Sequence, residues 1–225
     1  MEYRYLGSTG LQVSTLGFGA SPFGGVFGAI DDAEAVRAVH TAIDLGINYF
    51  DVSPFYGLTK AETVLGKTLL GISRDKYVLS TKVGRYGDTE FDFSAARVTA
   101  SVDESLARLS TDYADIILCH DIEYGSLDQI IHETLPALRE LQAAGKARFI
   151  GISGLPMKIF HDVSERADLD TILSYCHYTL YDTTLTGFIS SAKSRKLNVG
   201  IINASALGMG LLTEQGPPSW HPAPE

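Results

Sequence analysis

The chain has 225 residues, of which 45% are hydrophobic and 20% are charged, a balance typical of one soluble globular domain with a sizeable core. The net charge of −9 disfavours nucleic acids and anionic membrane surfaces as partners. No apolar run is long enough to span a bilayer, and no apolar segment of a signal peptide follows the first residues.

The first twenty residues predict a short β-hairpin and one strand. Two strand-like segments, 3–6 and 12–14, flank a turn that contains Gly7 and Gly10. A strand at 15–20 follows and ends in the small residues Gly19 and Ala20. Small residues at a strand end permit a bound molecule to approach the backbone closely.

Helices and strands then alternate to the end of the chain. Asp31, Ser94 and Asp182 are expected to cap helices, and Gly46 to end the first of them. The expected inward face of that first helix carries Val36, Val39 and Ile43. Strands are expected at 47–52, 77–82, 114–120, 148–153, 171–175 and 198–203, and helices at 31–46, 61–69, 94–109, 131–141, 156–166 and 182–193.

This alternation predicts an α/β fold, either an open doubly wound sheet or a (β/α)₈ TIM barrel. The strands are continuous apolar runs, as expected when both faces of a sheet are covered. No G-x-G-x-x-G follows the first strand, and polar residues at several strand ends favour the barrel. Seven of the eight strands are found, and 216–225 has the composition of a loop-like tail. We therefore expect residues 1–225 to be a single domain that is incomplete at its C-terminus.

Polar side chains stand where three neighbouring strands should end. Asp51 ends the strand at 47–52, Lys82 the next, and His120 the one after. The loop after Asp51 contains Ser53-Pro54 and Gly57, and Tyr56 lies on it. If the strands are parallel neighbours, Asp51, Tyr56, Lys82 and His120 meet at one edge of the sheet.

Such a group is suited to proton transfer. An ammonium beside a phenol lowers the pKa of the phenol, so Lys82 could activate Tyr56, with Asp51 positioning Lys82. A neutral His120 could donate a hydrogen bond to a substrate oxygen. Together they could protonate a carbonyl or deprotonate an alcohol. Since none of them can carry a hydride, the set implies a nicotinamide cofactor.

Each of these residues also has a plainer interpretation. A single aspartate at a strand end is more often a turn residue. A single tyrosine in a loop is more often a surface or core residue, and a single lysine is more often a solvated strand end. Only the conjunction of the four indicates a site. The pair Cys119-His120 could suggest a metal, but adjacent strand residues face opposite sides and no C-x-x-C accompanies them, so we expect no metal site.

The remaining histidines and the cysteines are expected to be structural. His40, His132 and His161 lie on helical patterns and are expected to be exposed. Cys119 and Cys176 are the only cysteines and lie in apolar segments, which favours buried thiols over a disulfide. Buried thiols are the default in a reducing compartment, so we expect a cytoplasmic protein.

The motifs around these residues together resemble the aldo-keto reductase superfamily. They are 46–51 with Tyr56-Gly57, 80–82, 115–120, 151–153 and 205–212. The resemblance implies a (β/α)₈ barrel closed at its bottom by an N-terminal hairpin, and an oxidoreductase that uses NAD, with NADP possible. It assigns catalysis to Asp51, Tyr56, Lys82 and His120, with Tyr56 as the general acid/base.

Three further segments, 18–24, 173–178 and 216–222, resemble a sugar dehydrogenase subgroup of that superfamily. That resemblance implies NAD-dependent oxidation of the C1 hydroxyl of L-galactose to L-galactono-1,4-lactone, a step of ascorbate biosynthesis. Two alternatives stay open: NADPH-dependent reduction of small aldehydes or ketones, and a truncated, non-catalytic binding protein of the same fold. The oligomeric state is not readable.

The resemblance also implies a cofactor site, with departures from the superfamily pattern. Gly154 stands where an asparagine is common, Tyr175 where a glutamine is common, and Ala204 where a tyrosine is common. Members of the superfamily continue past this length, with segments that hold the pyrophosphate and adenosine, so we expect this chain alone to fold poorly or to bind cofactor weakly. The expected cofactor contacts are Gly19, Ala20, Asp51, Ser153, Tyr175, Ser205 and Leu207.

Overall fold

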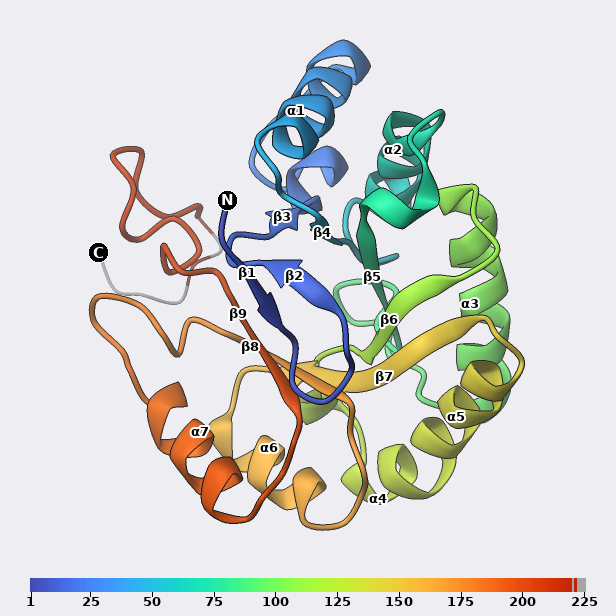
Figure 1. Cartoon of the computed structure of the whole chain (residues 1–225), viewed down its shortest axis with the longest axis vertical. Helices are drawn as coiled ribbons and strands as arrows, with labels where there is room; N and C mark the ends of the chain where they lie inside the picture. Colours follow the sequence, from blue (N-terminus) through green and yellow to red (C-terminus); the bar gives the residue numbers. More distant parts are fainter. Residues whose placement is uncertain (220, 222–225) are drawn as a thin grey trace.

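The computed structural model of the chain describes residues 1–219 and 221, and a parallel sheet of seven strands lies at its centre. The strands follow one another in sequence order, whereas a doubly wound sheet reverses its strand order. The sheet curls and the helices cover its outer side (Figure 1), so the barrel prediction is confirmed. The strands are β3 (Phe18–Gly19), β4 (Tyr49–Asp51), β5 (Val78–Val83), β6 (Ala114–Cys119), β7 (Ala147–Gly154), β8 (Thr171–Tyr175) and β9 (Gly200–Ala204).

The helices connect successive strands, and two of them begin at the capping residues that the sequence predicts. The Asp31 side chain accepts a hydrogen bond from the Glu34 amide, and the Ser94 side chain accepts one from the Arg97 amide, so both predicted caps are present. A π-helical turn, Ile130–Thr134, joins two of the helices into one continuous segment. The helices are α1 (Asp32–Asp44), α2 (Lys60–Leu69), α3 (Ala95–Leu109), α4 (Leu127–Gln129), α5 (Leu135–Ala143), α6 (Met157–Ser164) and α7 (Leu185–Ser194).

Side chains on the two faces of the sheet form separate cores. Outward-facing residues pack under the helices, as Ile117 and Cys119 of β6 do. Inward-facing residues fill the interior of the curl, as Ile116 and Leu118 of the same strand do. All four side chains are fully buried, because the period of two along a strand sends successive residues to opposite faces. The inward-facing polar residues at the carboxyl ends of the strands therefore lie together at one end of the interior.

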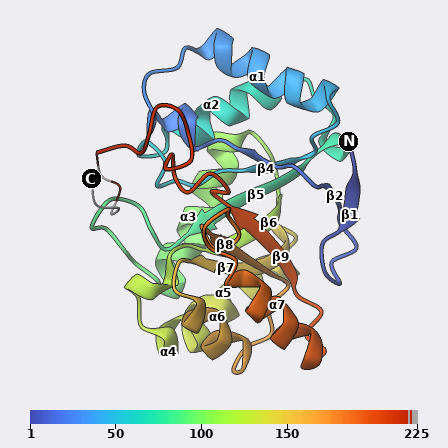
Figure 2. The same cartoon turned by 90° about the vertical axis from the view of Figure 1, so that its left-hand side faces the viewer.

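The hairpin of β1 (Tyr3–Tyr5) and β2 (Gln12–Ser14) covers the amino ends of the strands. The Ser8 amide donates to the Asn198 carbonyl at 2.9 Å, which attaches the turn of the hairpin to the start of β9. Leu6 and Leu11 of the turn insert into the interior core. Figure 2 shows the hairpin at one end of the sheet and the segment after β9 at the other. The hairpin therefore covers the end of the barrel where the strands begin, and the carboxyl ends of the strands form the opposite, upper end.

Three local expectations were wrong. Val36 is 38% exposed, and the buried face of α1 is instead formed by Ala35, Val39 and Ala42. α7 begins at Leu185, and Asp182 caps the Thr184 amide in the preceding turn rather than the helix. His161 is half-buried, because its ring packs edge-on against Phe188 at 5.0 Å between ring centres.

Other local expectations concern exposure, the tail and membrane segments. His40 and His132 are exposed, and both cysteines are buried and unpaired, as predicted. In the predicted loop-like tail 216–225, residues 216–219 and 221 form no helix or strand; residues 220 and 222–225 lie outside the described residues. Within the part of the chain that the structure describes, no helix combines the length and the apolar character that crossing a membrane requires.

Gly151 provides a test of the contact between β7 and β8. A Cβ atom at this position would lie 2.0 Å from the Thr171 carbonyl oxygen, which belongs to the backbone of β8 and has little freedom to move. Gly151→Ala is expected to lower the free energy of unfolding by about 2 kcal/mol. Gly187→Ala, in open space on α7, is the control and should raise it by about 0.5–1 kcal/mol. Chemical denaturation measures both, and equal effects of the two variants would contradict the packing described.

Candidate active site

A buried ion pair links the ends of β4 and β5. Lys82 is only 1% exposed, and its Nζ lies 2.6 Å from Oδ2 of Asp51, the last residue of β4. The ammonium also donates to the Val52 carbonyl oxygen at 2.9 Å. Asp51 pairs with Ser80 across the two strands, so Lys82 stands two residues further along on the same inward face. This register is what lets the ammonium reach the end of β4.

Tyr56 reaches the same ammonium from the loop that follows β4. The Lys82 Nζ donates to the Tyr56 hydroxyl oxygen at 3.2 Å. The loop is held by close packing of two glycines: a Cβ at Gly57, whose φ is +62°, would lie 2.3 Å from the Gly24 carbonyl oxygen. No side chain fits between these backbones, so the position of the loop, and with it that of Tyr56, is fixed by their contact.

The protonation states of the two groups follow from burial and charge. Burial raises the pKa of Tyr56, and although Lys82 opposes this shift, the pKa remains above its usual value. For Lys82, burial is the largest single effect and opposes the charged form, but Asp51 and Tyr56 together outweigh it, so the pKa is raised. At neutral pH the pair is therefore a neutral phenol beside an ammonium. The expectation that Lys82 would lower the phenol pKa below its usual value was wrong in its net direction.

His120 follows β6 and faces the phenol. It is 5% exposed, and its ring meets the Tyr56 ring edge-on, with 5.8 Å between ring centres. Its Nδ1 lies 3.1 Å from the Ser53 Oγ, and its Nε2 lies 3.6 Å from Oδ2 of Asp121. Burial lowers the pKa of His120 to about 3, against the opposing effect of Asp121. The imidazole is therefore neutral at physiological pH and offers one donor and one acceptor.

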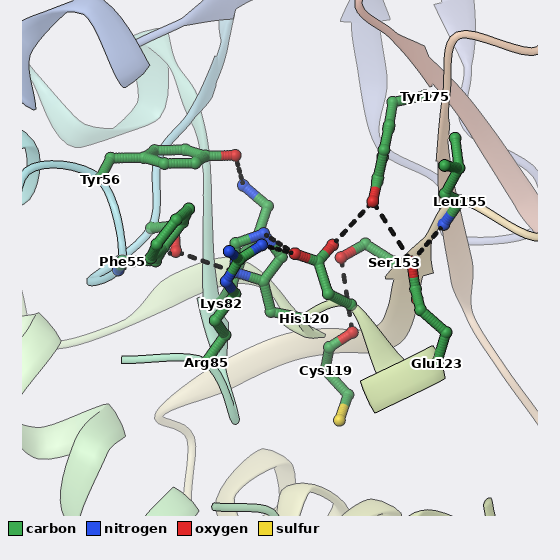
Figure 3. Close-up of polar contacts among 12 residues, drawn as sticks. Phe55, Tyr56, Lys82, Arg85, Cys119, His120, Glu123, Ser153, Leu155 and Tyr175 are labelled. Carbon is green, nitrogen blue, oxygen red and sulfur yellow. Dashed lines mark hydrogen bonds and ion pairs between the residues drawn. The ribbon is translucent and has the colours of Figure 1, made fainter. Parts of the chain in front are cut away.

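The four residues expected at the strand ends come together in the folded chain. Figure 3 shows Tyr56, Lys82 and His120 on one side of the close-up, where Lys82 bonds to the phenol. Asp51 completes the group through its ion pair with Lys82. Cys119 takes no part, because it faces the outer core and not the interior. The arrangement provides a proton donor, a fixed positive charge and a neutral hydrogen-bonding imidazole within one small volume.

A second polar group adjoins the first and continues toward β8. Asp121, with a φ of 49°, is held by Arg85, whose Nη1 lies 2.5 Å from Oδ2. The Tyr175 hydroxyl lies 3.3 Å from both Asp121 Oδ1 and Glu123 Oε1. Figure 3 shows its contact with Glu123. Glu123 also accepts from the Leu155 amide at 2.9 Å. Burial, reinforced by the two carboxylates, raises the pKa of Tyr175, so this phenol stays protonated and donates to one of them.

The residues expected to contact a cofactor lie at this same end of the sheet, in different surroundings. Gly19 has open space beside its Cα, and Ala20 is fully buried with its amide donating to the Asp51 carbonyl at 2.8 Å. Ser153, at the end of β7, is buried and donates to the Cys119 carbonyl at 3.5 Å. Ser205 and Leu207 follow β9 in an exposed turn. Their contact with a cofactor remains a prediction.

Sequence reasoning missed four polar residues of this region: Ser53, Arg85, Asp121 and Glu123. Asp121 and Glu123 lie one and three positions after His120, and a search of the residues just after each strand would have found them and Arg85. The sequence around Ser53 indicated only a turn, and nothing in it pointed to the contact with His120.

Among the described residues, no group of three or more His, Cys, Asp or Glu side chains is placed to hold a metal ion.

Comparison with known proteins identifies the fold family. The family model described as the aldo/keto reductase family matches residues 15–223. The chain belongs to the aldo/keto reductase family. It is 57% identical to an L-galactose dehydrogenase of Arabidopsis thaliana, over 99% of this chain and 70% of that protein. It is 33% identical to a D-threo-aldose 1-dehydrogenase of a Pseudomonas species, over 93% of this chain and 70% of that protein. The aldo-keto reductase AKR11C1 of Bacillus halodurans (holo form) superposes with a TM-score of 0.82 at 30% identity, over 97% of this chain and 71% of that one.

The ion pair between Lys82 and Asp51 should contribute to the free energy of unfolding in a way that single and double variants can measure. Lys82→Met leaves the Asp51 carboxylate, 14% exposed, without its partner, and Asp51→Asn leaves the ammonium without a counter-charge. Each single variant is expected to lose about 3 kcal/mol of unfolding free energy. The double variant should recover most of that loss, because no unpaired charge remains, while activity stays lost in all three. Denaturant titrations of the three variants measure this, and a loss in the double variant equal to the sum of the single losses would contradict it.

Proposed function

We propose that this chain is an NAD-dependent oxidoreductase that oxidises the C1 hydroxyl of L-galactose to L-galactono-1,4-lactone, with NADP as the alternative to NAD. The observation that supports this type of reaction is the hydrogen bond between Lys82 and the Tyr56 phenol, because a phenol that transfers a proton requires such a contact. The choice of sugar and of C1 rests on the similarity to the L-galactose dehydrogenase, and the D-threo-aldose 1-dehydrogenase supports oxidation at C1.

In the proposed reaction, the C1 hydroxyl loses its proton and C1 loses a hydride. Tyr56 as phenolate accepts the hydroxyl proton, and the Lys82 ammonium stabilises that phenolate. Asp51 holds the ammonium in place and is itself shielded from water. His120 donates a hydrogen bond to the C1 oxygen, which orients the sugar while the C1–O bond gains carbonyl character. In the reverse direction the neutral phenol of Tyr56 returns the proton.

The residues at the upper end of the interior fit a nicotinamide cofactor. Two buried carboxylate oxygens, Asp51 Oδ1 and Glu123 Oε2, have no hydrogen-bond partner among the described residues and can accept from ribose hydroxyls and from an amide. Gly19 leaves open space at the end of β3. Asp51, Glu123, Ser153 and Gly19 would hold the nicotinamide end, which supplies the hydride acceptor when it is bound.

The setting we propose is the cytosol and the synthesis of ascorbate. Cys119 and Cys176 are free and buried, which suits a reducing compartment. The ascorbate pathway follows from the sugar, because L-galactono-1,4-lactone is the product of the proposed step.

The first test is formation of NADH from NAD and L-galactose by the purified chain. Tyr56→Phe removes the group that accepts the proton and should lower kcat by about 100-fold or more. Tyr124→Phe, an exposed phenol on the surface, is the control and should keep the activity of the unchanged chain. Equal activity of the Tyr56→Phe variant and the control would rule out the proposed role of Tyr56.

The raised pKa of Tyr56 predicts how the rate depends on pH. Oxidation needs the phenolate, so below the phenol pKa its kcat/KM should rise about tenfold per pH unit between neutral and alkaline pH. Reduction of the lactone needs the neutral phenol and should be flat over the same interval. His120, with a pKa of about 3, should add no step near pH 6.5. Initial rates from pH 6 to pH 10 measure this, and a step near pH 6.5 would contradict the neutral imidazole.

A further inference from the structure

Ser53 occupies a fully buried position between the backbone of its own loop and the imidazole of His120. Its Oγ accepts a hydrogen bond from the Phe55 amide at 3.1 Å. The same Oγ lies 3.1 Å from Nδ1 of His120. Ser53 thus bridges the loop that carries Tyr56 and the residue that ends β6.

The single hydroxyl proton of Ser53 has one acceptor within reach. The Phe55 amide is a donor, so the Ser53 proton is free to point to Nδ1. The opposite arrangement, with a proton on Nδ1 donating to Oγ, would give Oγ two donors and leave its own proton without an acceptor among the described residues. A buried donor without an acceptor is unfavourable. The contact therefore favours a bare Nδ1 and a proton on Nε2.

The surroundings of Nε2 favour the same tautomer. Oδ2 of Asp121 lies 3.6 Å from Nε2, beyond the length of a hydrogen bond, and is itself engaged by Arg85 at 2.5 Å. A proton on Nε2 faces this negative charge favourably, whereas a lone pair there would be repelled by it. Nε2 makes no hydrogen bond to another described residue, so its proton is available to a ligand.

We propose that Ser53 is a positioning residue that holds neutral His120 as its Nε2–H tautomer, so that the imidazole presents a donor and not a lone pair to the C1 oxygen of the sugar. The proposal rests on the proposed function for the identity of that oxygen. In the other tautomer, Nε2 would offer a lone pair to an oxygen lone pair, and the site would lose its donor.

The tautomer can be observed directly by ¹⁵N NMR of the ring nitrogens of His120, because a protonated and a bare imidazole nitrogen resonate far apart. Spectra of the whole chain labelled at histidine, at pH 7, should show a bare Nδ1 and a protonated Nε2, with a His120→Gln variant to assign the signals. Ser53→Ala should shift both signals toward each other, as the Nδ1–H tautomer becomes populated.

A matched control separates this effect from the loss of a buried hydroxyl. Ser174 is also fully buried, but lies on the outward side of β8, with its Oγ 4.0 Å from the Met157 sulfur. Ser174→Ala should leave the His120 signals unchanged. Unfolding midpoints of the two variants show whether either has lost its fold. Unchanged His120 signals in a folded Ser53→Ala chain would overturn the proposal.

Steady-state kinetics then test the use of the tautomer. Ser53→Ala should lower kcat for L-galactose oxidation by about 10- to 100-fold, because a fraction of the enzyme lacks the donor, and it should keep the rise of rate with pH that Tyr56 causes. Shifted NMR signals with an unchanged kcat would overturn the catalytic part. If the unchanged chain shows no activity with L-galactose, the proposed function fails, while the NMR comparison still decides whether Ser53 sets the tautomer.

Discussion

The upper end of this barrel depends on one buried ion pair. Lys82 remains charged at 1% exposure because the Asp51 carboxylate meets its ammonium at 2.6 Å and the Val52 carbonyl meets it at 2.9 Å. The pair requires β4 and β5 to end side by side, which fixes where the following loop begins. That loop delivers Tyr56 to the same ammonium, and the same charge helps to keep His120 neutral. Fold and chemistry thus share one electrostatic constraint.

The sequence predicted the core of this arrangement because strand ends are marked by local composition. An apolar run that stops at Asp51 or at Lys82 predicts both a strand and the polar residue at its end. Because the strands are parallel neighbours, their ends then lie at the same edge of the sheet. The contacts of Ser53 with His120 and of Arg85 with Asp121 join residues 67 and 36 positions apart, and no local pattern encodes them. The pKa direction of Tyr56 was missed for a different reason: it depends on how deeply the phenol is buried, which only the folded chain defines.

The two polar groups at this end meet at Asp121. On one side lie β4, β5 and β6 with the Lys82 pair, and on the other lie Glu123 and Tyr175. Asp121 contacts Arg85, which follows β5 on the first side, and Tyr175 on the second. Arg85 in turn lies 3.7 Å above the ring of Phe55, in the loop that carries Tyr56. Asp121 and Arg85 thus connect both groups to this loop through side chains that are partly or fully buried.

The sheet order has a consequence for the stability of its individual strands. Each inner strand, such as β6, is hydrogen-bonded on both sides, whereas β3 and β9 each pair with one neighbour among the described residues. Amide groups on the open side of β9 consequently lack a strand partner among the described residues, and its residues are only partly buried beyond Gly200. Hydrogen exchange should then follow a gradient around the curl, slowest in β5, β6 and β7 and fastest at β3 and β9. Opening of the sheet is therefore expected to begin at its two edge strands, and the ion pair of β4 and β5 lies only one strand from β3.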